Sequence, residues 1–220
     1  MKKMKKIGFL LAAMTFTGSA FAAKSLPEVS HDGLHLQKGS KVAAVYKAEG
    51  ADLSQYKEVA LLEAYVAFKK NWKRDYNRNE VGLDGRINDR EMKKIRDEVA
   101  KEFNKVFTEV LSKEGGHKMV TEGAEGVLII RPAIINLEVT SPDLMTAGMS
   151  RTASGSAGQL TLYMELLDGK TGALIYRVID PEAAGNDMWQ IRNEVTNRAD
   201  MDRVLKRWAN LLNDQLSQMK

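Results

Sequence analysis

Two glycine-rich motifs contain residue types that hold phosphates or activate a serine in other proteins. Residues 169–171 (GKT) match the end of a phosphate-binding loop, but Met164 occupies the position of a glycine that this loop requires. Residues 154–158 (SGSAG) resemble a nucleophile elbow, but Ser154 replaces the first glycine and a strand-like run follows instead of a helix. We therefore interpret both segments as loops, place Gly172 at a hairpin turn, and predict no catalytic residue and no cofactor.

Residues that ligate metals are sparse. The chain has no cysteine, which excludes disulfides and thiolate metal sites. His31 and His35 are four residues apart and would share a face only on a helix, which Gly33 between them disfavours. Met145 and Met149 are too few for a thioether copper site, which normally has three or more soft ligands. The sequence predicts no metal site.

Residues 68–78 (FKKNWKRDYNR) combine five basic residues, one acid and three aromatic rings. Lysine and arginine beside exposed aromatic rings bind anionic lipid head groups, polyanionic glycans or nucleic acids. In the alternative interpretation, Phe68 ends a buried strand, Trp72 covers the sheet edge and the charges are only solvated. We predict that this segment and the long loop at residues 141–158 contact a partner through Lys69, Lys70, Trp72, Lys73, Arg74, Tyr76, Arg78, Met145, Met149 and Arg151.

The first 22 residues are typical of a secretory signal peptide. Four lysines at positions 2–6 precede a short apolar stretch, and Ala20-Phe21-Ala22 is a small-x-small cleavage site. The stretch is too short to span a bilayer, and no later stretch resembles a membrane span. Cleavage after Ala22 removes four lysines and no acid, so 29 basic residues then face 29 acidic ones. We predict a periplasmic protein that binds no nucleic acid and, having no cysteine, is not lipid-anchored.

The pattern of apolar residues predicts the elements that position these segments. Asn88 and Glu91 have the spacing of a capping box, apolar residues then recur at helical spacing, and two glycines at positions 115–116 end the helix. Short apolar or alternating runs predict strands, and the turn at residues 168–172 predicts a hairpin. The predicted strands span residues 41–46, 58–68, 118–121, 126–140, 159–167 and 173–179, the helices span residues 89–113 and 197–220, and residues 72–85 and 141–158 are a polar turn and a long loop.

The order of these elements predicts an α+β fold, with two main helices packed on one face of a largely antiparallel sheet. An irregular lead-in at residues 23–41 precedes a single domain at residues 42–220. Within the long strand, Pro132 removes one donor from the hydrogen-bond ladder, which indicates an edge, a bulge or a bend at that point.

Four segments in this order resemble a bacterial secreted family, domain of unknown function 3313 (DUF3313). They are residues 45–59, residues 126–137, residues 158–185 with the ELLD and TG motifs, and the Trp208-Ala209 pair. Members are typically envelope lipoproteins of Gram-negative bacteria, so the resemblance implies an envelope location, although this chain lacks the lipid-bearing cysteine. The family has no established activity, and the resemblance therefore implies no catalytic residue.

We expect a noncatalytic periplasmic domain that binds a protein, glycan or lipid partner of the cell envelope. Two alternatives stay open. One is a hydrolase acting on envelope material, which requires an acid/base pair inside a deep pocket. The other is a small-molecule or lipid carrier, which requires an apolar cavity between the sheet and the helices.

Overall fold

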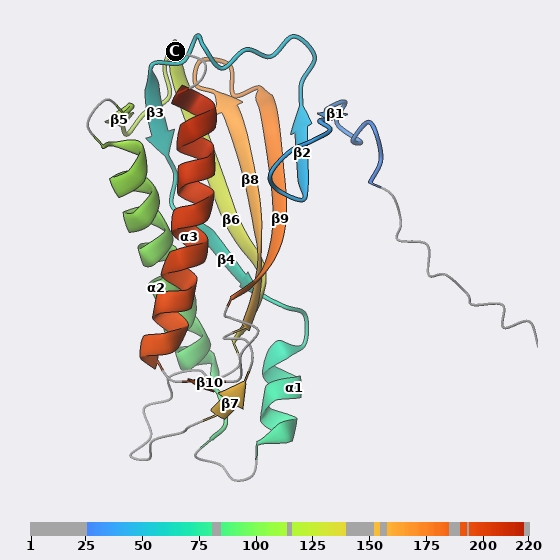
Figure 1. Cartoon of the computed structure of the whole chain (residues 1–220), viewed down its shortest axis with the longest axis vertical. Helices are drawn as coiled ribbons and strands as arrows, with labels where there is room; N and C mark the ends of the chain where they lie inside the picture. Colours follow the sequence, from blue (N-terminus) through green and yellow to red (C-terminus); the bar gives the residue numbers. More distant parts are fainter. Residues whose placement is uncertain are drawn as a thin grey trace, which may run out of the picture.

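The computed structural model describes residues 26–80, 85–113, 116–139, 152–154, 158–184, 190–192 and 194–217 (Figure 1). The predicted signal peptide at residues 1–22 lies outside the described residues, as do Met145, Met149 and Arg151. None of the helices in the described ranges is long and apolar enough to cross a membrane.

Eight of the described strands form one mixed, mostly antiparallel sheet. Its order is β1-β2-β9-β8-β6-β3-β5, and β4 also pairs with β6. Three pairs are parallel, namely β3 with β5, β3 with β6 and β4 with β6. The strands are β1 (His35–Leu36), β2 (Ala44–Lys47), β3 (Glu58–Leu61), β4 (Tyr65–Phe68), β5 (Lys118–Val120), β6 (Val127–Val139), β8 (Gly158–Asp168) and β9 (Leu174–Ala184), while β7 (Thr152–Ser154) and β10 (Gln190–Arg192) pair with each other.

Two long helices, α2 (Asp89–Leu111) and α3 (Glu194–Ser217), lie side by side on one face of this sheet (Figure 1). The predicted capping box begins α2: the Asn88 side chain accepts from the Arg90 and Glu91 amides, and the Glu91 carboxylate accepts from the Asn88 amide. The predicted α+β class is confirmed, with a third, short helix, α1 (Trp72–Asn79), added to it.

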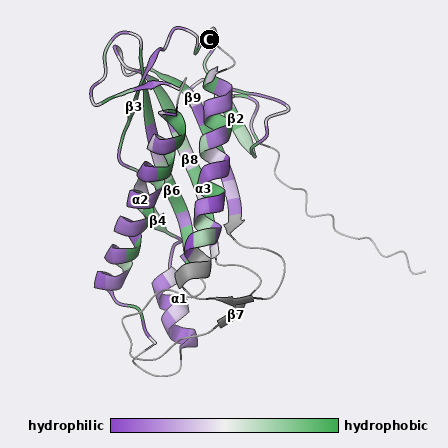
Figure 2. Cartoon of the chain, turned by 60° about the vertical axis from the view of Figure 1, so that its left-hand side comes forward, coloured by the Kyte–Doolittle hydropathy of each residue, from purple (hydrophilic) through white to green (hydrophobic). Residues whose placement is uncertain are grey.

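The core lies between these two helices and the sheet. Phe103 and Phe107 of α2 stack with their ring centroids 3.9 Å apart, and both rings are fully buried. Leu205 and Trp208 of α3 join them against the apolar face of β6 and β8. Figure 2 shows the matching pattern, with hydrophobic strands behind helices whose outer sides are hydrophilic. Burial of these apolar faces is the main force that holds the layers together.

The predicted strand at residues 58–68 is wrong in one respect, because it is two strands, β3 and β4, separated by residues 62–64. The cause lies on the neighbouring strand. The Leu62 amide donates to the Ile130 carbonyl in β6, and alternate residues of β6 turn their backbone groups toward the same neighbouring strand. Pro132, two residues after Ile130, therefore turns its backbone nitrogen toward the side of β3 and β4. Proline has no N–H to donate to that side, and the neighbouring strand is interrupted between β3 and β4 at this position. Pro132 therefore lies inside the sheet and not at its edge.

Residues 72–79 were predicted as part of a polar turn and instead form α1. Two contacts outside the helical hydrogen bonds hold this short helix. Trp72 and Tyr76, one turn apart, pack with centroids 5.5 Å apart, and the Asn77 side chain both donates to and accepts from the backbone of Ile87. Two further corrections are smaller: β1 lies in the predicted irregular lead-in, and β7 lies in the predicted loop at residues 141–158.

On the sheet face opposite the helices, a chain of ion pairs ties the lead-in to the strands. Arg177 of β9 donates to Asp32 at 3.0 Å and to Glu165 of β8 at 3.0 Å. Glu165 also accepts from Arg131 of β6 at 2.6 Å and from the Tyr163 hydroxyl at 2.9 Å. Burial raises the pKa of Glu165, but the hydrogen bonds from both arginines and Tyr163 outweigh it and leave the pKa lowered.

Asp32→Asn removes the outermost carboxylate of this chain. The hydrogen bond from Arg177 holds the pKa of Asp32 far below its ordinary value, so Asp32 stabilises the folded state above its unfolded pKa, and this stabilisation is lost as the pH falls toward the folded pKa. We expect the free energy of unfolding of the unchanged protein to exceed that of the variant at neutral pH, with a gap that narrows below about pH 4. Urea unfolding across this pH range measures the gap.

Glu109→Gln, at an exposed carboxylate of α2, is the control. Its difference from the unchanged protein should stay small at every pH. A gap for Asp32→Asn that is independent of pH would contradict the assigned role of Asp32.

Candidate functional site

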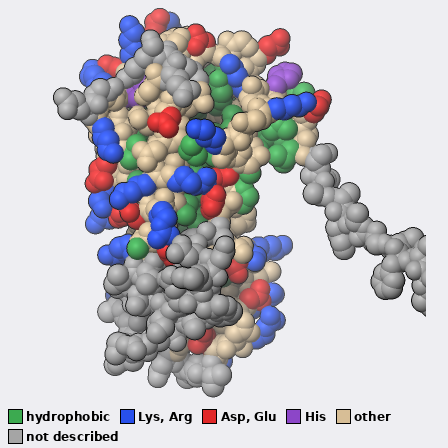
Figure 3. All heavy atoms as spheres, viewed as in Figure 1, with side chains coloured by type: hydrophobic (Ala, Val, Ile, Leu, Met, Phe, Trp, Pro, Cys, Tyr) green, Lys and Arg blue, Asp and Glu red, His purple; other side chains and the backbone are tan. Residues whose placement is uncertain are grey.

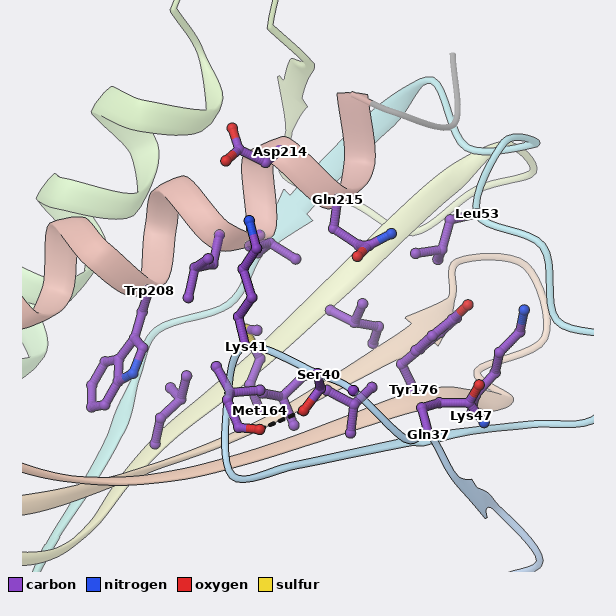
Figure 4. A pocket seen from close by; sticks show the side chains of 18 of the residues that line it. Gln37, Ser40, Lys41, Lys47, Leu53, Met164, Tyr176, Trp208, Asp214 and Gln215 are labelled. Atoms are coloured by element: carbon purple, nitrogen blue, oxygen red, sulfur yellow. Dashed lines mark hydrogen bonds between the residues drawn. The ribbon is translucent and has the colours of Figure 1, made fainter.

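A groove lies between α3 and strands β8, β9 and β2 (Figure 4). Residues 37–42, which join β1 to β2 and which we call the strap, close one side of it. The groove has a volume of about 470 Å³. Apolar side chains make most of its lining: Val42, Val45, Leu53, Leu162, Met164, Leu166, Tyr176, Val178, Trp208, Leu211 and Leu212.

Cross-strand register explains the apolar floor. Alternate residues of a strand face the same side of the sheet, so Met164 in β8, Val178 in β9 and Val45 in β2 form one row across three strands. Leu166 and Tyr176 form part of the next row. α3 packs along α2 and contacts β9, and β2 extends beyond the two helices (Figure 1). Val45, Val178 and Leu211 are therefore only half-buried.

Asp180 of β9 fixes both walls of the groove. Its carboxylate is 4% exposed and accepts from the Ala43 amide at 2.8 Å, directly after the strap. It also accepts from the Arg207 guanidinium at 2.6 Å and from the Trp208 indole N–H at 2.7 Å, both on α3. The buried charge thus has three donors, which is what a buried carboxylate requires. As a result the Trp208 ring is held in one orientation against the groove.

The polar groups of the groove lie at its rim. Lys38 and Lys41 belong to the strap, Lys47 ends β2, and Asp214 and Gln215 come from the last turns of α3. Figure 4 shows Trp208 at one end of the groove and Lys47 with Tyr176 at the other. An apolar interior with polar groups at the mouth is suited to a ligand that has an apolar body and a polar end.

Two of the motifs noted in the sequence take non-catalytic geometries. Asp168 Oδ1 accepts from the Lys170 and Thr171 amides, and Gly172 has a φ of 71°, so residues 168–172 form the predicted hairpin turn. His35 lies in β1, an extended strand, and it does not share a helix face with His31. Within the described ranges, no three His, Cys, Asp or Glu side chains are grouped so that they could hold a metal ion.

The basic-aromatic segment is built differently from an exposed binding patch. Trp72 is 6% exposed and stacks on Phe68 with centroids 4.5 Å apart. Burial, followed by the nearby Glu80, raises the pKa of Tyr76 to about 12. The aromatic rings thus pack on one another and on the sheet.

Ion pairs connect the charges of this segment to other elements. Lys69 pairs with Glu138 of β6 at 2.9 Å, and Lys73 pairs with Asp89 of α2 at 2.7 Å. Arg74 and Arg78 both lie near Asp75, at 3.0 Å and 3.5 Å. Lys70 is exposed. The predicted contact of these residues with a partner stays a prediction.

Sequence reasoning did not find the groove. The alternation of Leu160, Leu162, Met164 and Leu166 marks an apolar sheet face, but it does not show which part of that face the helices leave bare. The rim lysines are spread over two elements and form no motif.

The segment from the lead-in to the last helix matches one family model. Residues 28–212 match the model described as Protein of unknown function (DUF3313). The chain belongs to this family. The DUF3313 match spans the strap, the strands of the floor and most of α3, so nearly the whole groove is built from family sequence. No curated protein matches the chain.

Solved structures similar to this DUF3313 protein share little sequence with it. A variant PelC dodecamer from Paraburkholderia phytofirmans is 11% identical, with a TM-score of 0.38 over 77% of this chain and 95% of that one. A candidate lipoprotein from Caulobacter crescentus is 10% identical, with a TM-score of 0.32 over 76% and 90%. A candidate homologue of the neuraminyllactose-binding hemagglutinin from Helicobacter pylori is 10% identical, with a TM-score of 0.32 over 77% and 87%.

Trp72→Ala tests the packing role of the basic-aromatic segment in this DUF3313 protein. Removal of a buried indole is expected to lower the free energy of unfolding by about 3–5 kcal/mol. Lys70→Gln, two residues away and exposed, is the control and should change it by less than about 0.5 kcal/mol. Equal effects of the two variants in urea unfolding would show that Trp72 does not anchor α1.

Asp180→Ala tests the connection between the two walls. It leaves the Ala43 and Trp208 N–H groups without their acceptor and Arg207 without one of its two carboxylates, so we expect a loss of about 2–4 kcal/mol in the free energy of unfolding. Glu182→Ala removes the other, more exposed carboxylate from Arg207 and should cost less than about 1 kcal/mol. A larger loss for Glu182→Ala, measured by urea unfolding, would contradict this ranking.

Proposed function

We propose that this DUF3313 protein is a noncatalytic binding domain of the bacterial cell envelope, and that its groove holds the acyl chain of a lipid. The observation that supports this proposal is the apolar cavity of about 470 Å³ between α3 and the sheet. Its volume lies within the range of about 300–1,000 Å³ that is usual for ligand sites. Such a cavity is the feature that a lipid carrier requires.

The lining supplies the binding energy for an acyl chain. Half-buried Val45, Val178 and Leu211 face the groove from three different elements, and a ligand would remove their remaining surface from water. Each buried methylene group contributes about 0.8 kcal/mol. Because Trp208 is already held by its hydrogen bond to Asp180, the site loses little side-chain freedom when it is filled.

The distribution of polar groups supports binding rather than catalysis. A hydrolase would need an acid/base pair that reaches its substrate inside the pocket. Among the described residues that line this groove, Asp214 is the only carboxylate and none is a histidine, while Leu162, Met164 and Trp208 are apolar. The signal-like leader and the envelope location of similar family members support assignment to the cell envelope.

The neutral fluorophore N-phenyl-1-naphthylamine tests whether the groove accepts an apolar body. We expect its fluorescence to rise on binding, with saturation at one molecule per chain. Val178→Phe fills the groove from its floor and Leu211→Phe fills it from the α3 wall. Each should weaken binding at least about tenfold, since a filled cavity leaves no room for the probe. Because the two substitutions lie in different elements, a folding defect in one variant would not explain a loss of binding in both.

Leu62→Phe provides the matched control, because Leu62 is an apolar side chain, 41% exposed, that does not line the groove. Its affinity for the fluorophore should equal that of the unchanged protein. Binding that is lost in neither filling variant would place the probe elsewhere and overturn the proposal.

A further inference from the structure

Positive charge is concentrated at the mouth of the groove. Three lysines, Lys38, Lys41 and Lys47, border it, against the single carboxylate of Asp214. On the face shown in Figure 3, basic and acidic side chains are interspersed. The excess at the rim is therefore local, and a local field acts mainly on a ligand that is already at the groove.

The three lysines differ in how their charge is used within the protein. Lys38 lies 4.0 Å from Glu28, but both side chains are more than four-fifths exposed, so this pair is weak. Lys47 lies over the Tyr176 ring at 5.6 Å. The pKa of Asp52 is lowered mainly by hydrogen bonds from Ser54 and to a smaller degree by Lys47, so Lys47 also has a carboxylate in its vicinity.

Lys41 has no ion pair within 4.0 Å among the residues that the structure describes. It extends from the strap along the groove toward α3, as Figure 4 shows, while its backbone lies in the strap. An ammonium group beside an apolar cavity, with no carboxylate partner, is a ready site for an anion.

We propose that the ligand of the groove is an anionic single-chain amphiphile, whose acyl chain lies along Met164 and Val178 and whose head group binds Lys41. This inference rests on the proposed function, because the same groove holds the chain. The charge at its mouth is complementary to an anionic head and not to a neutral or cationic one.

Two lysophospholipids with the same tetradecanoyl chain and different head groups distinguish the contribution of the head group to binding from that of the chain. Lysophosphatidylglycerol carries a net negative charge, and lysophosphatidylcholine is zwitterionic. Each is titrated, below its micelle concentration, against protein loaded with N-phenyl-1-naphthylamine. We expect the anionic lipid to displace the fluorophore at a concentration about fivefold lower, as one partly exposed ion pair allows. Glycerol 3-phosphate, which has the anion without the chain, should displace nothing.

The variants assign this preference to named residues. In Lys41→Gln, the ratio between the two lipids should fall to about one, while affinity for the neutral fluorophore is retained. Lys101→Gln, at an exposed lysine of α2 away from the groove, is the charge-matched control and should keep the ratio of the unchanged protein. Asp214→Asn should raise the ratio, because it removes the one opposing carboxylate of the rim.

The possible failures are distinguishable. Equal displacement by both lipids from the unchanged protein would overturn the anionic head group and leave the apolar groove standing. Binding of the fluorophore by none of the proteins would overturn both. If glycerol 3-phosphate displaced the fluorophore and neither lipid did, the groove would contain a phosphate site without a lipid site. This result would overturn the inference.

Discussion

The buried carboxylate of Asp180 is the contact on which the architecture of the groove depends. It accepts hydrogen bonds from three donors that belong to two segments far apart in the sequence, the end of the strap and the middle of α3. A charge that is removed from water must be fully paired, and this requirement sets how close the strap and α3 approach β9. Hydrophobic burial brings the layers together without direction, whereas Asp180 supplies the specific geometry.

β9, the strand that carries Asp180, also anchors the part of the lead-in that precedes the strap. Arg177 and Asp180 are three residues apart and lie on opposite faces of β9, since successive side chains of a strand alternate. Arg177 binds Asp32 on the face away from the helices, and Asp180 binds the Ala43 amide on the helix side. Residues 32–43, which include the edge strand β1, are therefore anchored by a charged side chain of β9 on each face of the sheet.

Local signals made much of this fold predictable. The capping box at Asn88, the helical spacing of apolar residues and the turn at Asp168 act within a few residues, and α2 and the β8–β9 hairpin follow them. The interruption between β3 and β4 was not predictable, because its cause is Pro132 on another strand. The groove was missed for a similar reason: its existence depends on where α3 lies beside α2, and helical spacing does not encode that position.

The walls of the groove come from the most widely separated parts of the described chain, residues 37–42 and residues 208–215. Contacts of such high sequence separation close the largest loops of the chain, so they are expected to form late in folding. The β8–β9 hairpin, which makes most of the floor, can form before either wall arrives. The groove thus exists only in a completely folded chain, and a proteolytic cut that releases either terminal segment would abolish it.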